Sequence, residues 1–173
     1  MNKSKFIYLL TVLIVIAGGL YVWKTSDANQ KEYISNGEML KSKKTTPILT
    51  ETNVEYFEGA KGYFARPEAE GSYPAVVMIH ENRGLRPETK FTADQLAKEG
   101  YMVLAVDLLG GKAVETQDEA KVLSANFKQD VGIKNMQAAV AYLKSQGATK
   151  VGSLGWCFGG AQSLQLSLSG EKL

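Results

Sequence analysis

The hexapeptide Gly155-Trp156-Cys157-Phe158-Gly159-Gly160 decides the fold of this chain, because it separates a strand pattern from a helix pattern. Residues 150–154 form a short apolar run of strand type, and residues 161–168 place apolar side chains at helical spacing without a breaker. In a sharp turn between a strand and a helix, the central residue is held in a strained conformation with its side chain exposed. Gly155 and Gly159 flank that position, where side chains would collide with the strand or the helix. The pattern predicts a nucleophile elbow centred on Cys157.

Two interpretations of Cys157 compete. A lone free cysteine is commonly a small buried hydrophobic residue. The Gly-x-Cys-x-Gly frame between a strand and a helix favours a nucleophile instead. Glycine-rich nucleotide loops are excluded by spacing, since the chain has no Gly-x-Gly-x-x-Gly. Ala161-Gln162 also stands where a phosphate loop requires Lys followed by Ser or Thr.

Composition and charge exclude several function classes. The chain has 173 residues, 45% hydrophobic and 22% charged, which is typical of a globular domain. Its net charge of +2 resides at the amino-terminal end: Lys3, Lys5 and the excess of lysines in residues 24–46 leave residues 47–173 at about −2. This acidic balance argues against a nucleic-acid surface. One cysteine and one histidine exclude an intrachain disulfide and a standard zinc site, so we expect neither a metal nor a cofactor.

Residues 6–23 form an uncharged, mostly apolar run that is just long enough to span a bilayer. Lys3 and Lys5 precede it, which favours a cytoplasmic amino terminus. We expect residues 1–23 to be a membrane anchor, an N-terminal transmembrane helix that leaves the domain extracytoplasmic. The alternative is a cleaved signal peptide with a small-x-small site at Ser26-Asp27-Ala28, which would make the domain a secreted one.

Residues 24–52 are polar, rich in lysine and aperiodic over most of their length. Such a stretch is typical of a solvated linker. We therefore expect three parts: the anchor or signal segment 1–23, the linker 24–52 and a single domain 53–173.

The domain alternates strand and helix patterns. Residues 54–58 and 62–66 predict a β-hairpin. Buried strands are predicted at 75–79, 101–106 and 150–156, and helices at 89–98, 115–127 and 131–143. In the first helix Phe91, Leu96 and Ala97 are expected to face inward; in the last, Ile133, Met136, Val140 and Leu143 form one apolar stripe. The alternation predicts a mostly parallel, doubly wound α/β sheet with its site at the carboxyl ends of the strands, where His80, Glu81, Asp107 and Cys157 lie.

These residues resemble the dienelactone hydrolase family of the α/β-hydrolase superfamily. The resemblance covers residues 53–173 and rests on four stretches: 62–67, 77–85, 104–108 and 151–160. Its most specific feature is a cysteine elbow paired with His-Glu-Asn-Arg-Gly at 80–84. It implies an α/β-hydrolase fold and hydrolysis of a small-molecule ester or lactone through an acyl-enzyme on the cysteine.

The resemblance also implies roles for individual residues. Cys157 would be the nucleophile, and Glu81 the carboxylate that holds the resting thiol and takes part in ionising it. The oxyanion hole would come from the backbone N–H groups of Asn82 and Phe158. Arg83 would orient a carboxylate on the substrate, or lie in solvent as a loop cation.

Other residues depart from the family's catalytic pattern. His80 and Asp107 precede the nucleophile in the chain, whereas the triad acid and histidine of this fold follow it. We therefore expect His80 to be a structural loop histidine and Asp107 a strand-end cap. Leu109 stands where dienelactone hydrolases proper carry a tyrosine, which argues against dienelactone itself as substrate.

Sixteen residues follow Cys157, among which Glu171 is the only acid and no histidine occurs. We expect the triad Asp and His to lie outside this chain, which would be the amino-terminal part of a longer hydrolase with an incomplete fold. A complete but degenerate product is the alternative. In either case we expect little turnover and an open apolar edge beside the elbow strand.

Two function classes follow from these observations. The first is an exported, membrane-anchored cysteine hydrolase of small esters or lactones. The second is a non-catalytic, membrane-tethered α/β module that uses the same pocket to bind a ligand or partner. The intact Gly-x-Cys-x-Gly and Glu81 favour the first, since a binding module needs no thiol on a strained turn.

Overall fold

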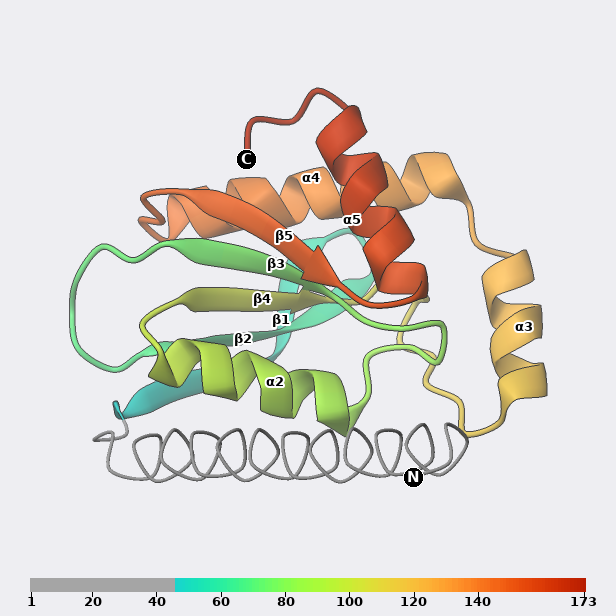
Figure 1. The fold of residues 1–173 in the computed structure, drawn as a ribbon, viewed down its shortest axis with the longest axis horizontal. Coiled ribbons are helices and arrows are strands. Elements are labelled where there is room, and N and C mark those ends of the chain that lie inside the picture. The colour runs from blue at the N-terminus through green and yellow to red at the C-terminus, as the bar shows by residue number, and fades with distance from the viewer. Residues whose placement is uncertain (1–45) are drawn as a thin grey trace, which may run out of the picture. The chain divides into compact units, whose positions relative to one another are not determined.

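A five-stranded sheet organises residues 46–173, the part of the chain that the computed structural model describes. Its strands are β1 (Ile48–Phe57), β2 (Ala60–Pro67), β3 (Ala75–Ile79), β4 (Met102–Val106) and β5 (Val151–Gly155). Its helices are α2 (Pro87–Lys98), α3 (Gln117–Ala125), α4 (Gln129–Ser145) and α5 (Phe158–Leu168). Figure 1 shows α2 on one face of the sheet, α4 and α5 on the other, and α3 beyond its end. Helices on both faces agree with the predicted doubly wound arrangement.

The sheet is mixed rather than mostly parallel. In the order β1-β2-β4-β3-β5, the central β3 is parallel to both β4 and β5, whereas β2 is antiparallel to β1 and β4. The short turn between β1 and β2 requires an antiparallel pair, while the helical crossovers after β3 and β4 allow parallel ones. The predicted hairpin is present, but β1 begins at Ile48. Residues 48–52, which the sequence placed in the linker, therefore belong to the sheet.

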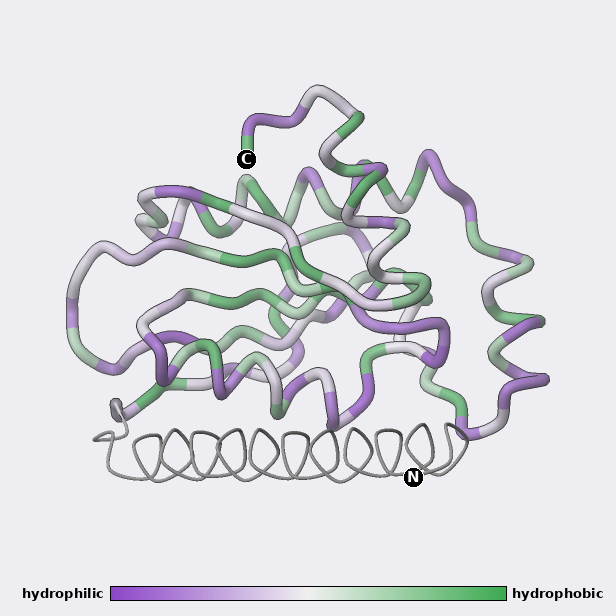
Figure 2. The backbone as a smooth tube through the Cα atoms, in the orientation of Figure 1, coloured by the Kyte–Doolittle hydropathy of each residue, from purple (hydrophilic) through white to green (hydrophobic). Residues whose placement is uncertain are grey.

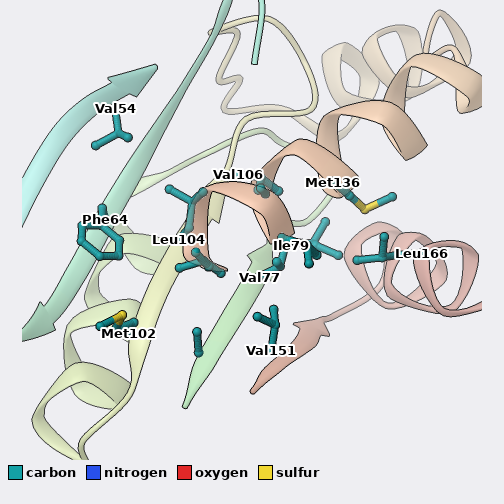
Figure 3. Close-up of a cluster of buried hydrophobic side chains, with 14 residues drawn as sticks. Val54, Phe64, Val77, Ile79, Met102, Leu104, Val106, Met136, Val151 and Leu166 are labelled. Atoms are coloured by element: carbon teal, nitrogen blue, oxygen red, sulfur yellow. The ribbon is translucent and has the colours of Figure 1, made fainter. Parts of the chain in front are cut away.

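The core lies on both faces of the sheet, because alternate residues of each strand point in opposite directions. On one face, Val77, Ile79, Leu104 and Val106 pack against Met136 and its neighbours in a cluster built with α4 and α5 (Figure 3). On the other, a smaller cluster joins the sheet to α2; it contains Tyr63, Ala65, Met78, Ala93, Ala97, Val103 and Ala105. Figure 2 shows β3 and β4 hydrophobic along their length and the loop after β3 hydrophilic. Burial of their apolar side chains therefore holds the strands in the core, and the polar loop after β3 stays at the surface, where it can form a site.

The helices differ from the predictions at their ends and in one side chain. α2 begins at Pro87, where a proline is favoured because the first helical N–H needs no partner. α3 is shorter than expected, since Thr116 and Glu119 form a capping box at its start. Phe91 was predicted to face inward, and this was wrong: it is 64% exposed, and Ala93 and Ala97 form the buried stripe of α2. The small alanines bring α2 close to the sheet.

The side of the domain next to the elbow is apolar. Within residues 46–173, β5 pairs only with β3, so its other edge has no strand partner. On α5, Leu164 is 58% and Leu168 71% exposed. The expected open apolar edge is thus present in the described part of the chain.

The predictions for residues 1–45 concern positions outside the described range. Among residues 46–173, none of the helices combines the length and the apolarity that crossing a bilayer requires.

Candidate active site

Cys157 occupies a sharp turn between β5, which ends at Gly155, and α5, which begins at Phe158. Its backbone angles are φ 51° and ψ −118°, a combination that residues with a side chain rarely adopt. The Gly159 N–H donates to the Trp156 carbonyl at 2.8 Å, and the Ala161 N–H donates to the Cys157 carbonyl at 3.1 Å. These bonds hold the turn, and the Cys157 side chain is exposed. The expected strand-turn-helix is present, with the thiol at the amino-terminal end of α5.

The two glycines that flank Cys157 admit no side chain. A Cβ atom on Gly155 would lie 2.5 Å from the carbonyl carbon and oxygen of Gly159. A Cβ atom on Gly159 would lie 2.4 Å from the carbonyl oxygen of Ile79 and 2.7 Å from that of His80. The first glycine allows the turn to close on itself, and the second allows α5 to begin directly against the end of β3.

The loop after β3 lies beside this turn as a consequence of strand register. β3 and β5 are parallel neighbours, and Ile79 is paired with Gly155. Glu81 and Cys157 each follow two residues after that pair. The sheet therefore brings the His-Glu-Asn-Arg-Gly loop and the cysteine turn to the same end of adjacent strands, although more than 70 residues separate them.

Glu81 is exposed and lines a pocket of about 260 Å³ with Arg83, Gly84, Arg86 and other residues of the α2 start. Among residues 46–173, no hydrogen bond joins the Glu81 carboxylate to Cys157. Within the same residues, no hydrogen bond is donated by the backbone N–H groups of Asn82 and Phe158. Arg83 is half-buried in the same pocket and forms no ion pair within the described range.

The loop that carries these residues is fastened to the segment before α3. The Val114 N–H donates to the Arg83 carbonyl at 3.0 Å, and the Arg86 guanidinium donates to the Val114 carbonyl at the same distance. Arg86 also pairs with Glu115 at 2.7 Å and with Glu88 at 3.2 Å. Hydrogen bonding from Arg86 lowers the pKa of the Glu88 carboxyl. These contacts hold the loop after β3 against the segment that precedes α3.

His80 is 1% exposed and makes hydrogen bonds through both ring nitrogens. Nδ1 lies 2.6 Å from the Glu81 carbonyl oxygen, and Nε2 accepts the Leu108 N–H at 3.1 Å. The ring is stacked on Phe158 with an interplanar angle of 12°. Desolvation by burial lowers the pKa of His80, against the raising effects of the Glu81 carbonyl and Asp107. With both nitrogens engaged, His80 has a structural place in the loop, as its position in the sequence indicates.

Asp107 acts as a strand-end cap, also as expected. Its carboxylate accepts the backbone N–H groups of Leu109 and Gly111 in the loop that follows β4. Its backbone is held in turn by Tyr56 and Asn135: the Asp107 N–H donates to the Tyr56 hydroxyl at 2.9 Å, and the Asn135 amide donates to the Asp107 carbonyl at 3.0 Å. Tyr56 donates to Asn135 at 2.7 Å, and burial strongly raises the pKa of its hydroxyl. Asp107 therefore shapes the loop beside the site.

An apolar pocket next to the elbow was not predicted from the sequence. It has a volume of about 250 Å³ and is lined mainly by Leu108, Leu109, Leu123, Phe127 and Val131, with Lys112 and Lys128. Phe127 packs edge-to-face on Phe158, with ring centroids 5.0 Å apart. The sequence signal that could have revealed it is the aromatic Phe127 at the end of the predicted helix 115–127, two residues past the end of α3.

The chain is similar to known proteins in both sequence and fold. A model described as the Dienelactone hydrolase family matches residues 60–173. A Bradyrhizobium protein named Probable 2-oxo-3-(5-oxofuran-2-ylidene)propanoate lactonase is 32% identical over 123 residues, covering 62% of this chain and 46% of the relative. The carboxymethylenebutenolidase of Pseudomonas putida is 28% identical over 136 residues, covering 71% of this chain and 58% of the relative.

Among solved structures, a dienelactone hydrolase-like promiscuous phosphotriesterase from metagenomic libraries is similar to this chain with a TM-score of 0.64 and 30% identity. The match covers 71% of this chain and 55% of that protein. The chain spans about half the length of the curated relatives it matches.

Proposed function

Because this chain belongs to the dienelactone hydrolase family, we propose that it is the nucleophile-bearing part of a hydrolase of small carboxylic esters or lactones. The observation that carries the proposal is the strained backbone of Cys157 at the start of α5, between two glycines that admit no side chain. Such strain is costly and persists where the surrounding structure enforces it, as at active sites. A buried structural cysteine would need none of it.

The proposed reaction proceeds through a thioester. Glu81 takes up the proton of the Cys157 thiol, and the thiolate sulfur attacks the carbonyl carbon of the ester. A C–S bond forms, the C–O bond to the alcohol breaks, and the departing oxygen takes the proton held by Glu81. Water then hydrolyses the thioester, which releases the acid and restores the thiol.

The negative charge that develops on the carbonyl oxygen would be stabilised by the Asn82 and Phe158 N–H groups. Phe158 is the first residue of α5, where the positive end of the helix dipole favours an anion. The free N–H groups and the adjacent strand ends support this assignment. Arg83 is proposed to orient a carboxylate on the substrate from the neighbouring pocket.

The apolar pocket beside Phe158 supports a substrate with a hydrophobic part. Phe127 connects that pocket to the elbow through its contact with Phe158. Lys112 and Lys128 at its margin would favour an anionic group at the far end of the substrate. One relative is named a lactonase, which supports cyclic esters as candidates.

The 173-residue chain is expected to complete the first half of this reaction faster than the second. In this fold a histidine activates the water that releases the acyl group. Among residues 46–173 the one histidine is His80, and both of its ring nitrogens are engaged in hydrogen bonds to the backbone. We therefore propose that acylation accumulates and turnover is slow.

The test is a single-turnover reaction with p-nitrophenyl acetate, in which nitrophenol release and acetylation of the intact protein are followed together by absorbance and mass spectrometry. We expect a burst of about one nitrophenol per chain, with the acetyl group on Cys157. Cys157→Ala should abolish the burst, and Glu81→Gln should slow it while Glu58→Gln, in the turn between β1 and β2, should not. A chain that iodoacetamide alkylates at Cys157 but the ester does not acetylate would contradict the proposal and favour the non-catalytic ligand-binding module.

We also propose that the domain is exported and tethered through residues 6–23. The proposal rests on the uncharged apolar run and the lysines that precede it. Residues 1–46 fused to alkaline phosphatase lacking its own signal should give active enzyme in the membrane fraction of a bacterial host. Activity in the soluble periplasmic fraction would indicate signal cleavage, and an inactive fusion would contradict export.

A further inference from the structure

We infer that His80 is a positioning residue, which aims the two backbone N–H donors of the oxyanion hole through a hydrogen bond to Glu81 and a stack on Phe158. This inference rests on the proposed function, because it assigns His80 a part in the same site. It differs from the expectation of a merely structural loop histidine, since it makes the chemistry at Cys157 depend on one ring nitrogen.

The tautomer of His80 follows from its partners. The Leu108 backbone N–H can only donate, so Nε2, which lies 3.1 Å from it, must be the unprotonated nitrogen. Nδ1 then carries the proton and donates to the Glu81 carbonyl at 2.6 Å. Burial lowers the pKa of the ring and so keeps this neutral form.

The hydrogen bond to Glu81 determines where the next amide points. The peptide bond between Glu81 and Asn82 is trans, as all peptide bonds in residues 46–173 are. In a planar trans peptide the C=O and the following N–H point in opposite directions. A carbonyl turned toward the His80 ring therefore turns the Asn82 N–H away from it. The Gly84 N–H donates to the same carbonyl at 3.2 Å, which closes the turn around this orientation.

The same ring supports the second donor. The rings of His80 and Phe158 are nearly parallel, with centroids 6.0 Å apart, and Phe127 packs edge-on against Phe158. The Phe158 side chain thus contacts two rings, and its residue begins α5. His80 lies on the loop after β3 and contacts Leu108 in the loop after β4 and Phe158 in α5, so it links the elements that supply both donors.

No part for His80 as a general base is compatible with these contacts. One nitrogen accepts a backbone N–H, the other donates to a backbone carbonyl, and the side chain is almost wholly buried. Its effect on the reaction must therefore act through the positions of Asn82 and Phe158. Oxyanion-hole donors are worth about 10²- to 10³-fold in rate, so misdirecting one gives a measurable loss.

The first test measures the tautomer in the unmodified protein. His80 is the only histidine in the chain, so ¹⁵N-histidine labelling without a histidine tag gives the signals of a single ring. We expect Nδ1 to show the shift of a protonated nitrogen and Nε2 that of an unprotonated one near neutral pH. The opposite tautomer would overturn the inference, because Nδ1 could not then donate to Glu81. This measurement needs no variant and stands even if substitutions at His80 prevent folding.

The second test compares two substitutions that keep opposite halves of the ring's bonding. In His80→Asn, the amide nitrogen takes the place of Nδ1 and can still donate to the Glu81 carbonyl. In His80→Gln, the longer side chain reaches the Leu108 N–H with its oxygen and leaves the Glu81 carbonyl with the Gly84 N–H as its one remaining donor. Each variant is assayed for acetylation by p-nitrophenyl acetate and for alkylation by iodoacetamide. Alkylation is the control, because that reaction develops no oxyanion.

We expect His80→Gln to slow acetylation of Cys157 by about tenfold or more and to leave alkylation within about twofold. His80→Asn should retain acetylation within about threefold. Equal losses in both variants, or a parallel loss of alkylation, would show a structural role only and overturn the inference. If the unmodified chain is alkylated but not acetylated, the proposed function fails and the inference fails with it. If His80→Gln is acetylated at the rate of the unmodified chain, the inference fails and the proposed function stands.

Discussion

The backbone of Gly159 lies so close to Ile79 that a Cβ atom on Gly159 would be 2.4 Å from the Ile79 carbonyl oxygen. This contact joins the first turn of α5 to the end of β3. It links the cysteine turn to the start of the loop that carries Glu81 and Asn82, and it involves backbone atoms of a paired strand.

Gly159→Ala should therefore destabilise the domain by about 3 kcal/mol, because the added methyl must displace a paired strand. Gly160→Ala is the matched control. A Cβ atom there would lie 3.3 Å from the Gly155 carbonyl oxygen, and the helix propensity of alanine offsets part of the crowding, so we expect a change within about 1 kcal/mol. Urea unfolding followed by circular dichroism measures both. Equal effects of the two substitutions would contradict the packing described for α5.

Tyr56 offers a second test of the scaffold. Its hydroxyl donates to Asn135 and accepts the Asp107 N–H, and both partners are buried. Tyr56→Phe leaves these groups unpaired and should lower the free energy of unfolding by about 1–3 kcal/mol. Tyr73→Phe removes a hydroxyl that bonds the exposed Ala69 carbonyl and should cost at most about 0.5 kcal/mol. Unfolding curves that coincide for the two variants would show that the Tyr56 network adds nothing to stability.

Local patterns were sufficient to predict the elbow and the buried strands. The Gly-x-Cys-x-Gly frame indicates a sharp turn that has no room for side chains on either side of the cysteine, and continuous apolar runs indicate strands buried on both faces. These predictions therefore agree with the structure at β3, β4, β5 and α5.

Features that depend on distant partners were missed or mistaken. The antiparallel pairing of β2 with β4 depends on the order of the strands in the folded sheet, and the residue types of the two strands do not indicate it. Phe91 is apolar and at helical spacing, but the close approach of α2 through Ala93 and Ala97 leaves it outside. His80 contacts Leu108 in the loop after β4 and Phe158 in α5, and these partners become apparent only when the three elements are assembled.

The buried His80 should make stability depend on pH. Burial lowers its pKa in the folded state below the ordinary value of 6.5, so the unfolded chain binds the proton more readily. The stabilisation of the neutral ring is fully present above about pH 6.5 and is lost as pH falls from there toward the folded pKa. Within that window the free energy of unfolding should fall by up to about 1.4 kcal/mol per pH unit.

Urea unfolding of the parent chain and His80→Asn between about pH 7.5 and 5 isolates this effect. All other titratable groups are common to both proteins, so the difference between their unfolding free energies reports His80 alone. We expect the difference to shrink as pH falls, because the parent loses stability that the variant never had. A constant difference across the range would show that the His80 pKa is the same in the folded and unfolded states.

The exposed leucines of α5 predict self-association. Leu164 and Leu168 stand on the helix that packs against β5, whose outer edge has no partner among residues 46–173. Adjacent apolar side chains beside an unpaired strand favour contact with another copy of the domain. Leu168→Lys should raise the dissociation constant of that association by about tenfold or more, since it removes the burial of one leucine side chain. Val122→Lys, at a similarly exposed apolar position on α3, introduces the same charge away from the edge and should leave association unchanged. Sedimentation velocity over a range of protein concentrations measures the dissociation constant of each variant. An equal increase for Leu168→Lys and Val122→Lys would show that the added charge, and not the leucine surface of α5, changes the association.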